Sequence, residues 1–359
     1  MIRCFKACLQ KPICNLKTKI VDRQNNFDFL RLLFSSLVIF SHSFPLTKNP
    51  EILAVLTNNQ LDFGILAVDV FFIMSGYLIF NSLKYSKSSL NYMWKRCLRL
   101  FPALFFMLLF SLSIACVAYA GNNIFRQKDF YTYLPNNLSL YKVQYTIKNV
   151  FETNPYPKVI NGSLWSLCYE FTLYLFVLLF FPLRKNIKIV LYLLLISWAI
   201  SFYAHLVSPT SLKTIFAIVY LESIELYRLA TFFIAGSILS LVNLHKINTN
   251  LMKIILFVGL VLSLVFNVYA IFSNLLLPVL IILIGISFSK KLFFLPHKFG
   301  DISYGVYIYG FLVQQTLLNY FHLNPYWLAF ISLSITYVFS YFSWHYIEKT
   351  TLKYKNYLL

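Results

Sequence analysis

Long apolar runs separated by short polar or basic connections dominate the chain from about residue 27 to residue 348. A helix needs roughly 17 to 25 mostly apolar residues to cross the hydrocarbon of a bilayer. Runs of that length predict ten membrane-spanning helices, near residues 28–44, 64–82, 98–120, 164–183, 188–207, 226–243, 251–272, 274–289, 302–321 and 326–346. The eighth run is short, and we expect the apolar stretch 208–225 to form a re-entrant or interfacial helix, so the count ranges from nine to eleven.

The lysines and arginines test this layout, because cytoplasmic loops of membrane proteins carry an excess of them. With the N-terminus inside, 22 of the 31 fall on the cytoplasmic side and eight on the outer side, while Arg31 lies within the membrane. We therefore predict an all-α integral membrane protein with both termini cytoplasmic. Its predicted parts are a basic cytoplasmic tail at 1–26, one transmembrane domain at 27–348 and a second basic tail at 349–359.

The composition agrees with this prediction and excludes several classes of protein. The chain is 59% hydrophobic and only 12% charged, whereas about a quarter of the residues of a soluble domain are charged. The net charge of +19 follows from the topology, so no nucleic-acid partner is predicted. Cys4, Cys8 and Cys14 lack the paired spacing of a zinc site, and no metal is predicted.

Arg31 and His42 stand eleven residues apart in the first predicted span. On an α-helix this spacing gives about 16 Å of rise and only about 20° of rotation, so both side chains share one face. A cation and an imidazole inside a membrane helix are costly, which marks them as candidates for function. The alternative is a pair of interfacial residues whose polar ends reach toward water.

Asp69 lies near the outer third of the second span, on the same predicted side as His42. We expect the carboxylate to lie beside the imidazole, where it would set the tautomer and raise the basicity. In the alternative interpretation Asp69 caps a helix or bonds to the backbone.

Arg96 and Arg99 are three residues apart and share one face at the predicted cytoplasmic start of the third span, with Pro102 in its first turns. Paired guanidinium groups can clamp phosphates, although two arginines at a boundary would equally serve to anchor the topology. Glu170, in the outer part of the fourth span, could relay protons, contact an acceptor hydroxyl or pair with an arginine. Trp165 just before it could equally belong to the interfacial aromatic belt.

Several segments taken together resemble the bacterial acyltransferase-3 family of membrane acyltransferases. They are the Arg31 and His42 pair followed by DVFFIMSGYLI, RCLRLFP, NGSLWSLCYEF, SYGVYIYGFLVQQ and HYIEK, in order from about residue 27 to 349. One departure is that many members carry tryptophan and histidine where this chain has Tyr309 and Gly310.

The resemblance implies transfer of an acyl group, usually acetyl, from cytoplasmic acyl-CoA to a sugar hydroxyl of a surface polysaccharide or its lipid-linked precursor. It implies that His42 is catalytic, as base or acyl carrier. Because Asp69 and Glu170 are acidic residues within the spans, we add them to the candidate catalytic residues. Arg31, Arg96 and Arg99 would bind the acyl-CoA, and we assign Ser163, Trp165 and Tyr77 to the acceptor side. The expected location is the bacterial cytoplasmic (inner) membrane.

Other functions remain open from the sequence. A transporter or flippase for a lipid-linked sugar would also carry polar residues inside its spans, but no inverted repeat is visible. A polysaccharide polymerase or ligase would use arginine or histidine residues in large outer loops. The loop at 121–163 has a single arginine, Arg126, and no histidine. That loop is aromatic and rich in asparagine, which suits contact with sugars or lipid headgroups, and it could equally be a structured connector. A purely structural membrane subunit would not account for six ordered motifs.

Overall fold

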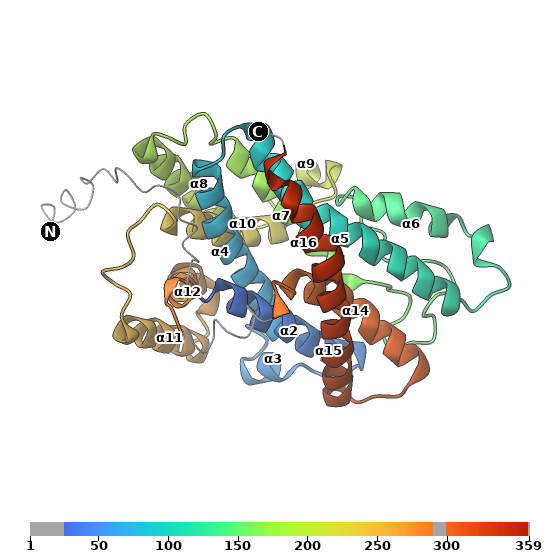
Figure 1. The fold of residues 1–359 in the computed structure, drawn as a ribbon. Helices are drawn as coiled ribbons and strands as arrows, with labels where there is room; N and C mark the ends of the chain where they lie inside the picture. The colour runs from blue at the N-terminus through green and yellow to red at the C-terminus, as the bar shows by residue number, and fades with distance from the viewer. Residues whose placement is uncertain (1–24, 290–298, 358–359) are drawn as a thin grey trace, which may run out of the picture.

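The computed structural model describes residues 25–289 and 299–357, and within these ranges its regular elements are all helical (Figure 1). The α-helices are α2 (Phe27–Leu46), α3 (Ile52–Leu56), α4 (Phe63–Lys84), α5 (Ser89–Val117), α6 (Lys128–Leu138), α7 (Trp165–Leu178), α8 (Ile187–Val207), α9 (Lys213–Ile218), α10 (Ser223–Leu239), α11 (Asn250–Val265), α12 (Tyr269–Ile286), α14 (Ser303–Tyr320), α15 (Pro325–Phe342) and α16 (Lys349–Thr351). Short 3-10 turns cover Ile124–Arg126, Gly162–Leu164 and Leu352–Asn356, and α15 continues as a π-helix over Ser343–Glu348.

Each of the ten predicted spans contains a helix. Among the described residues, six helices are long and apolar enough to cross a membrane: α2, α4, α5, α8, α12 and the helix that runs from Pro325 to Lys355. The chain is thus a multi-pass membrane protein, and ten spans with both ends cytoplasmic remain a prediction. The helices α7 and α11 are apolar but shorter, and α14 is largely buried among other helices. Burial against protein explains why α14 can carry Gln314 and Gln315.

Two predicted boundaries differ from the structure. The third span begins at Ser89 rather than near residue 98, because the Ser88 side chain caps α5 by accepting a hydrogen bond from the Asn91 backbone N–H (3.0 Å). Pro102 therefore lies inside α5 and not in its first turns. The predicted C-terminal tail is helical up to Asn356 and packs against the start of α5, where Trp94 donates a hydrogen bond to the Tyr354 carbonyl (2.9 Å). The N-terminal tail before Asn25 lies outside the described residues.

The helices α4 and α10 run side by side and form the tightest contact in the core. A Cβ atom at Gly76 would lie 1.9 Å from the Phe233 carbonyl oxygen, and a Cβ at Gly236 would lie 2.1 Å from the Ile73 carbonyl oxygen. Ser237 donates a hydrogen bond across the contact to the Gly76 carbonyl (3.2 Å). Only glycine allows this approach of two backbones, which is a common device for packing membrane helices.

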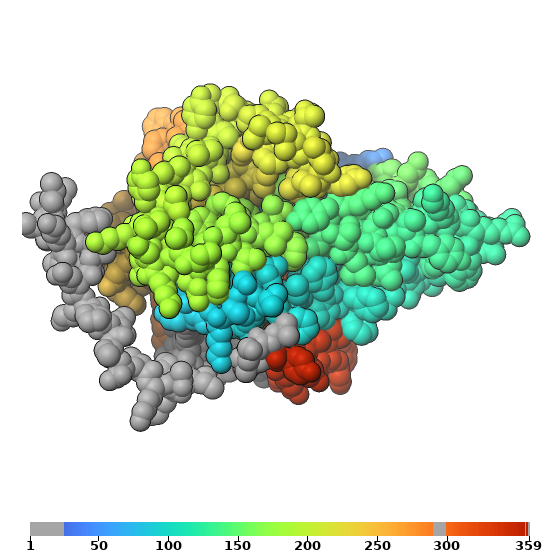
Figure 2. Space-filling view, turned by 90° about the horizontal axis from the view of Figure 1, so that it is seen from above, coloured from blue at the N-terminus to red at the C-terminus, as the bar shows by residue number. Residues whose placement is uncertain are grey.

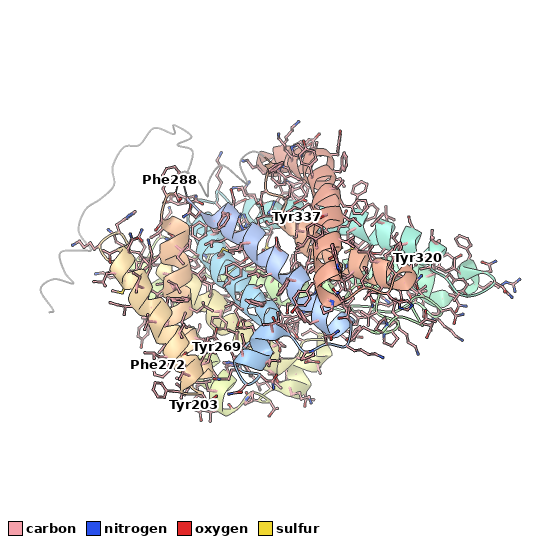
Figure 3. All side chains as sticks on the ribbon, turned by 90° about the horizontal axis from the view of Figure 1, so that it is seen from below. Tyr203, Tyr269, Phe272, Phe288, Tyr320 and Tyr337 are labelled. Atoms are coloured by element: carbon pink, nitrogen blue, oxygen red, sulfur yellow. The ribbon has the colours of Figure 1, made fainter. Side chains whose placement is uncertain are left out.

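The helix α2 lies between α14 and α15 and fixes the position of His42. Gln314 of α14 donates hydrogen bonds to the Ile39 carbonyl and to the Ser43 hydroxyl, both at 2.7 Å. On the α15 side, the hydroxyls of Ser36 and Tyr337 are 2.7 Å apart where the two helices cross (Figure 3). These contacts hold the polar face of α2 against protein and away from lipid.

The outer loop forms a compact layer at one end of the helices. Figure 2 shows the segment around α6 extending beyond the other described helices on one side. The part of this loop that leads to α7 is anchored on α14. Asn154 donates a hydrogen bond to the Gln315 side chain (2.8 Å), and Gln315 donates to the Val159 carbonyl (2.7 Å). The loop is therefore a structured cover over the end of α14.

We predict that alanine at Gly76 or at Gly236 destabilises the protein by at least about 2 kcal/mol, since each added Cβ would collide with rigid backbone. Thermal unfolding of the purified protein in detergent would measure the loss. Gly259→Ala is the matched control, because its Cβ would meet only a flexible Leu276 side chain at 3.0 Å. Equal melting temperatures for the three variants would contradict the assignment.

Candidate functional site

A cavity of about 160 Å³ lies between α2, α4, α5, α7 and α14. Its polar lining includes three of the predicted site arginines and a group of hydroxyl and carboxyl side chains: Arg31, Arg96, Arg99, Ser75, Ser166, Glu170, Tyr174, Ser303, Tyr304 and Tyr307. Residues from five helices that are distant in the sequence thus converge on one hollow. Such a convergence of polar groups in a mostly apolar surrounding is typical of a ligand site.

The arginines at one end of the cavity are held by carboxylates. Asp301, just before α14, is 2.6 Å from Arg99 and 3.3 Å from Arg31. Arg99 also lies 3.5 Å from the buried Glu348, and Arg31 lies 2.7 Å from Asp28. Although burial acts to raise it, the pKa of Asp301 is lowered to about 2 by the guanidinium groups of Arg99 and Arg31. Asp301 is therefore ionised, and it links α2, which carries Arg31, to α5, which carries Arg99.

Arg96 differs from the other two arginines. Among residues 25–289 and 299–357, no carboxylate lies within salt-bridge distance of it. The guanidinium donates only to the Ser82 hydroxyl (3.3 Å) and lies over the Tyr92 ring, and its Nε atom is buried without a partner. Since α5 starts at Ser89, Arg96 lies about 10 Å along the helix, inside the bundle and not at its end.

Glu170 faces the arginine cavity. It accepts hydrogen bonds from the Ser75 hydroxyl (2.9 Å) and from the Tyr174 hydroxyl. Of the roles considered for Glu170, the ion pair with an arginine is not formed. The carboxylate instead joins α4 to α7 across the cavity.

His42 lies on the same helix as Arg31, but it does not line the cavity. Its ring packs edge to face against Phe311 of α14, with the ring centroids 5.4 Å apart. The Nδ1 atom is buried and makes no hydrogen bond to the described residues. No carboxylate of the described residues orients the imidazole, and its buried Nδ1 is left without a partner.

The expected pair of His42 and Asp69 does not form. Asp69 is buried in α4 and makes an ion pair with Arg228 of α10, which also contacts Glu225 at 2.6 Å. A buried carboxylate is stabilised most by a cation within reach, and Arg228 supplies it from the helix that packs closest to α4. The sequence showed both residues, but their separation of 159 positions hid the pairing.

The three residues assigned to the acceptor side are not grouped together. The Tyr77 ring packs against Phe27 at the start of α2 (centroids 5.5 Å apart), at the end of α2 opposite to His42, so it does not lie with the other two, and its assignment to the acceptor side stays a prediction. Ser163 and Trp165 lie together at the start of α7. Ser163 is buried with an unpartnered hydroxyl, and Trp165 lines a groove with Tyr169.

Among the described residues, no group of three histidine, cysteine or acidic side chains is placed to hold a metal ion. Cys97, Cys116 and Cys168 are free, and the three tail cysteines lie outside the described residues.

Comparison with known proteins agrees with the geometry. The model of a family described as an acyltransferase domain matches residues 24–345. The chain belongs to the acyltransferase-3 family. It is accordingly a membrane acyltransferase.

Two curated relatives of this acyltransferase match over nearly their whole length. An O-acetyl transferase of Shigella phage Sf6 is 28% identical over 92% of this chain and 97% of its own length. Nodulation protein 10 of Rhizobium leguminosarum bv. viciae is 25% identical over 92% of this chain and 94% of its own. No solved structure matches the chain. Sequence reasoning missed Asp301 as part of this acyltransferase, and it noted Arg228 as a polar residue within the spans without pairing it with Asp69. Glu348 stands within the HYIEK segment.

We predict that Asp301→Asn lowers the melting temperature at neutral pH, and that its difference from the wild type narrows as the pH falls. The pKa of Asp301 is depressed from 3.8 to about 2, so its charge stabilises the fold above about pH 4 and this stabilisation is lost between about pH 4 and pH 2. Thermal unfolding at a series of pH values would test this. The exposed Asp129→Asn serves as control, and an offset that stays constant for Asp301→Asn down to pH 2 would refute the prediction.

Proposed function

We propose that this membrane acyltransferase is an O-acetyltransferase that moves the acetyl group of acetyl-CoA, or another acyl group of acyl-CoA, to a hydroxyl of a cell-surface polysaccharide or its lipid-linked precursor. His42 acts as catalytic base or acyl carrier. The arginine cavity binds the donor and faces the cytoplasm, where coenzyme A is found. The protein then works in the bacterial cytoplasmic (inner) membrane.

The observation that carries the proposal is the cavity with three guanidinium groups on its wall. Coenzyme A carries a diphosphate and a further phosphate, and guanidinium groups bind phosphates in a bidentate geometry. Arg31 and Arg99 share Asp301, whereas Arg96 lacks a carboxylate among the described residues. Arg96 is therefore the arginine whose charge can pair with a donor phosphate. Arg31 and Arg99 form the wall around it.

The arrangement of α14 suggests how the donor reaches His42. Ser303, Tyr304 and Tyr307 line the cavity, and Phe311, one turn after Tyr307, contacts His42. Residues four apart lie on one face of a helix, so this face leads from the cavity toward the imidazole. Arg31 and His42 are about 16 Å apart along α2, a distance that the extended pantetheine arm of coenzyme A can span.

The chemistry needs a proton acceptor beside the acceptor sugar. The sugar oxygen forms a bond to the thioester carbonyl carbon, a nitrogen of His42 takes the hydroxyl proton, and the carbon–sulfur bond breaks to release the coenzyme A thiolate. In the acyl-carrier alternative the imidazole nitrogen first receives the acyl group and then passes it to the sugar. The unpartnered Nδ1 of His42 suits either route.

The name of one relative favours acetyl transfer. The phage relative is called an O-acetyl transferase, and it covers nearly the same length of chain. The family match does not favour the transporter or flippase, which requires no coenzyme A. The proposal also includes the acceptor glycan, contact with membrane lipids and the location in the inner membrane.

We predict that His42→Ala abolishes acyl transfer and leaves the amount of protein in the membrane unchanged, because the imidazole packs at a half-buried position and anchors no ion pair. Mass spectrometry of the host surface glycan would show the loss of one acyl mass per repeat. His322→Ala, in an exposed loop, is the control. Full modification with His42→Ala would disprove the catalytic role.

We predict that Arg96→Ala raises the KM for acetyl-CoA about tenfold or more, since a hydrogen bond to a charged phosphate contributes about 1.5–3 kcal/mol. Arg96→Lys should recover only part of the affinity, because lysine lacks the bidentate geometry. Steady-state kinetics of the purified protein would give KM and kcat separately. Arg184→Ala, which stacks on Phe181 away from the cavity, should not alter KM, and an unchanged KM for Arg96→Ala would exclude the phosphate role.

A further inference from the structure

A second hollow, of about 530 Å³, lies at the start of α7. We call it the aromatic groove, and its lining is Tyr141, Lys142, Val143, Tyr145, Trp165, Cys168, Tyr169, Tyr220, Glu222 and Glu225. These residues come from the outer loop, from α7 and from the segment that leads into α10. The cavity and the groove lie on different faces of α7, because Ser166 and Glu170 face the cavity while Trp165 and Tyr169 face the groove.

The walls of the aromatic groove are held in place by hydrogen bonds and ring contacts. Trp165 packs edge to face against Tyr169 with their centroids 5.7 Å apart. The Tyr169 hydroxyl accepts a hydrogen bond from the Glu222 backbone N–H (3.0 Å). The hydroxyls of Tyr141 and Thr172 are 3.0 Å apart. The aromatic side chains therefore form a preorganised surface.

The charges of the aromatic groove differ from those of the arginine cavity. Glu222 is exposed, and Glu225 is held by Arg228 at 2.6 Å, which fixes the direction of its carboxylate. Lys142 is the only lysine or arginine in the described lining. An exposed glutamate and an exposed lysine do not face hydrocarbon, so the groove opens to water or to the headgroup region. Arg228 is shared between Glu225 and the buried Asp69, so these three residues hold two carboxylates against one cation, and Glu222 stands against Lys142. This excess of carboxylates disfavours an anionic ligand.

The aromatic groove lies close to the proposed catalytic residue. Gly162, one turn before Trp165, has no room for a side chain because a Cβ there would lie 2.7 Å from the Phe311 ring. Phe311 in turn packs against His42. The start of α7, which borders the groove, is thus linked to the imidazole through the Phe311 ring.

We propose that the aromatic groove binds the acceptor through uncharged sugar units, and that it discriminates against acidic sugars. This rests on the proposed function. The C–H faces of sugar rings stack on the Trp165 and Tyr220 side chains, and the carboxylates of Glu222 and Glu225 accept hydrogen bonds from the sugar hydroxyls. The arginine cavity takes the anionic donor, and the groove takes the neutral acceptor, so each substrate is steered to its own hollow by charge.

Direct glycan binding tests the proposal without relying on catalysis. The full chain in lipid nanodiscs would be applied to an array of neutral oligosaccharides and of oligosaccharides that contain uronic acid. We expect binding to neutral glycans, weakened about tenfold in Trp165→Ala and in Tyr220→Ala. Tyr220 is 60% exposed, so its removal leaves the core intact. Glu222→Gln should reduce the discrimination against uronic acids.

Trp327→Ala is the matched control, because Trp327 is 58% exposed at the start of α15 and lies outside the groove. Glycan binding that is absent, that prefers acidic glycans, or that is the same in Trp165→Ala and Tyr220→Ala as in the wild type would overturn the proposal. Failure of the proposed function appears separately, as transfer that needs no acetyl-CoA or persists in His42→Ala.

Discussion

The ionised Asp301 between Arg31 and Arg99 is the interaction on which the donor cavity depends. It joins the starts of α2 and α14 to α5, and Glu348 extends the cluster to the end of α15. In surroundings of low dielectric, removing one member of such a cluster leaves its partner charge uncompensated, which costs far more than an exposed ion pair. The cluster thus fixes the separation of the helices that wall the cavity, and it leaves Arg96 as the cation with no carboxylate partner among the described residues.

The arginine cavity and the aromatic groove lie on different faces of α7 and differ in charge. The guanidinium groups of the cavity favour an anionic ligand, such as the coenzyme A of the proposed function, and the carboxylates of the aromatic groove disfavour one. His42 lies beyond the end of the cavity and is separated from Gly162 only by the Phe311 ring. Through Phe311, this histidine contacts the helix face that lines the cavity and also the start of α7, which borders the aromatic groove.

The sequence predicted what depends on local periodicity and missed what depends on tertiary pairing. Apolar runs located the ten helical segments, and the helical repeat correctly placed Arg31 and His42 on one helix about three turns apart. It could not show that Asp69 pairs with Arg228, because the close approach of α4 and α10 depends on two glycines far apart in the chain. The contact of Tyr77 with Phe27 was hidden for the same reason, since it depends on which end of α4 meets the start of α2.

Many members of the family carry histidine where this chain has Gly310, and the packing of α2 against α14 explains the glycine. A Cβ at Gly310 would lie 2.5 Å from Ile39 Cγ1, so any side chain there would push the two helices apart. Gln314, one turn later, opposes that movement through its hydrogen bonds to the Ile39 carbonyl and the Ser43 hydroxyl. A Cβ at Gly310 would point toward Ile39, whereas His42 packs against Phe311. A histidine at position 310 would therefore need a different helix contact, and in this chain it is His42 of α2 that packs against Phe311 of α14.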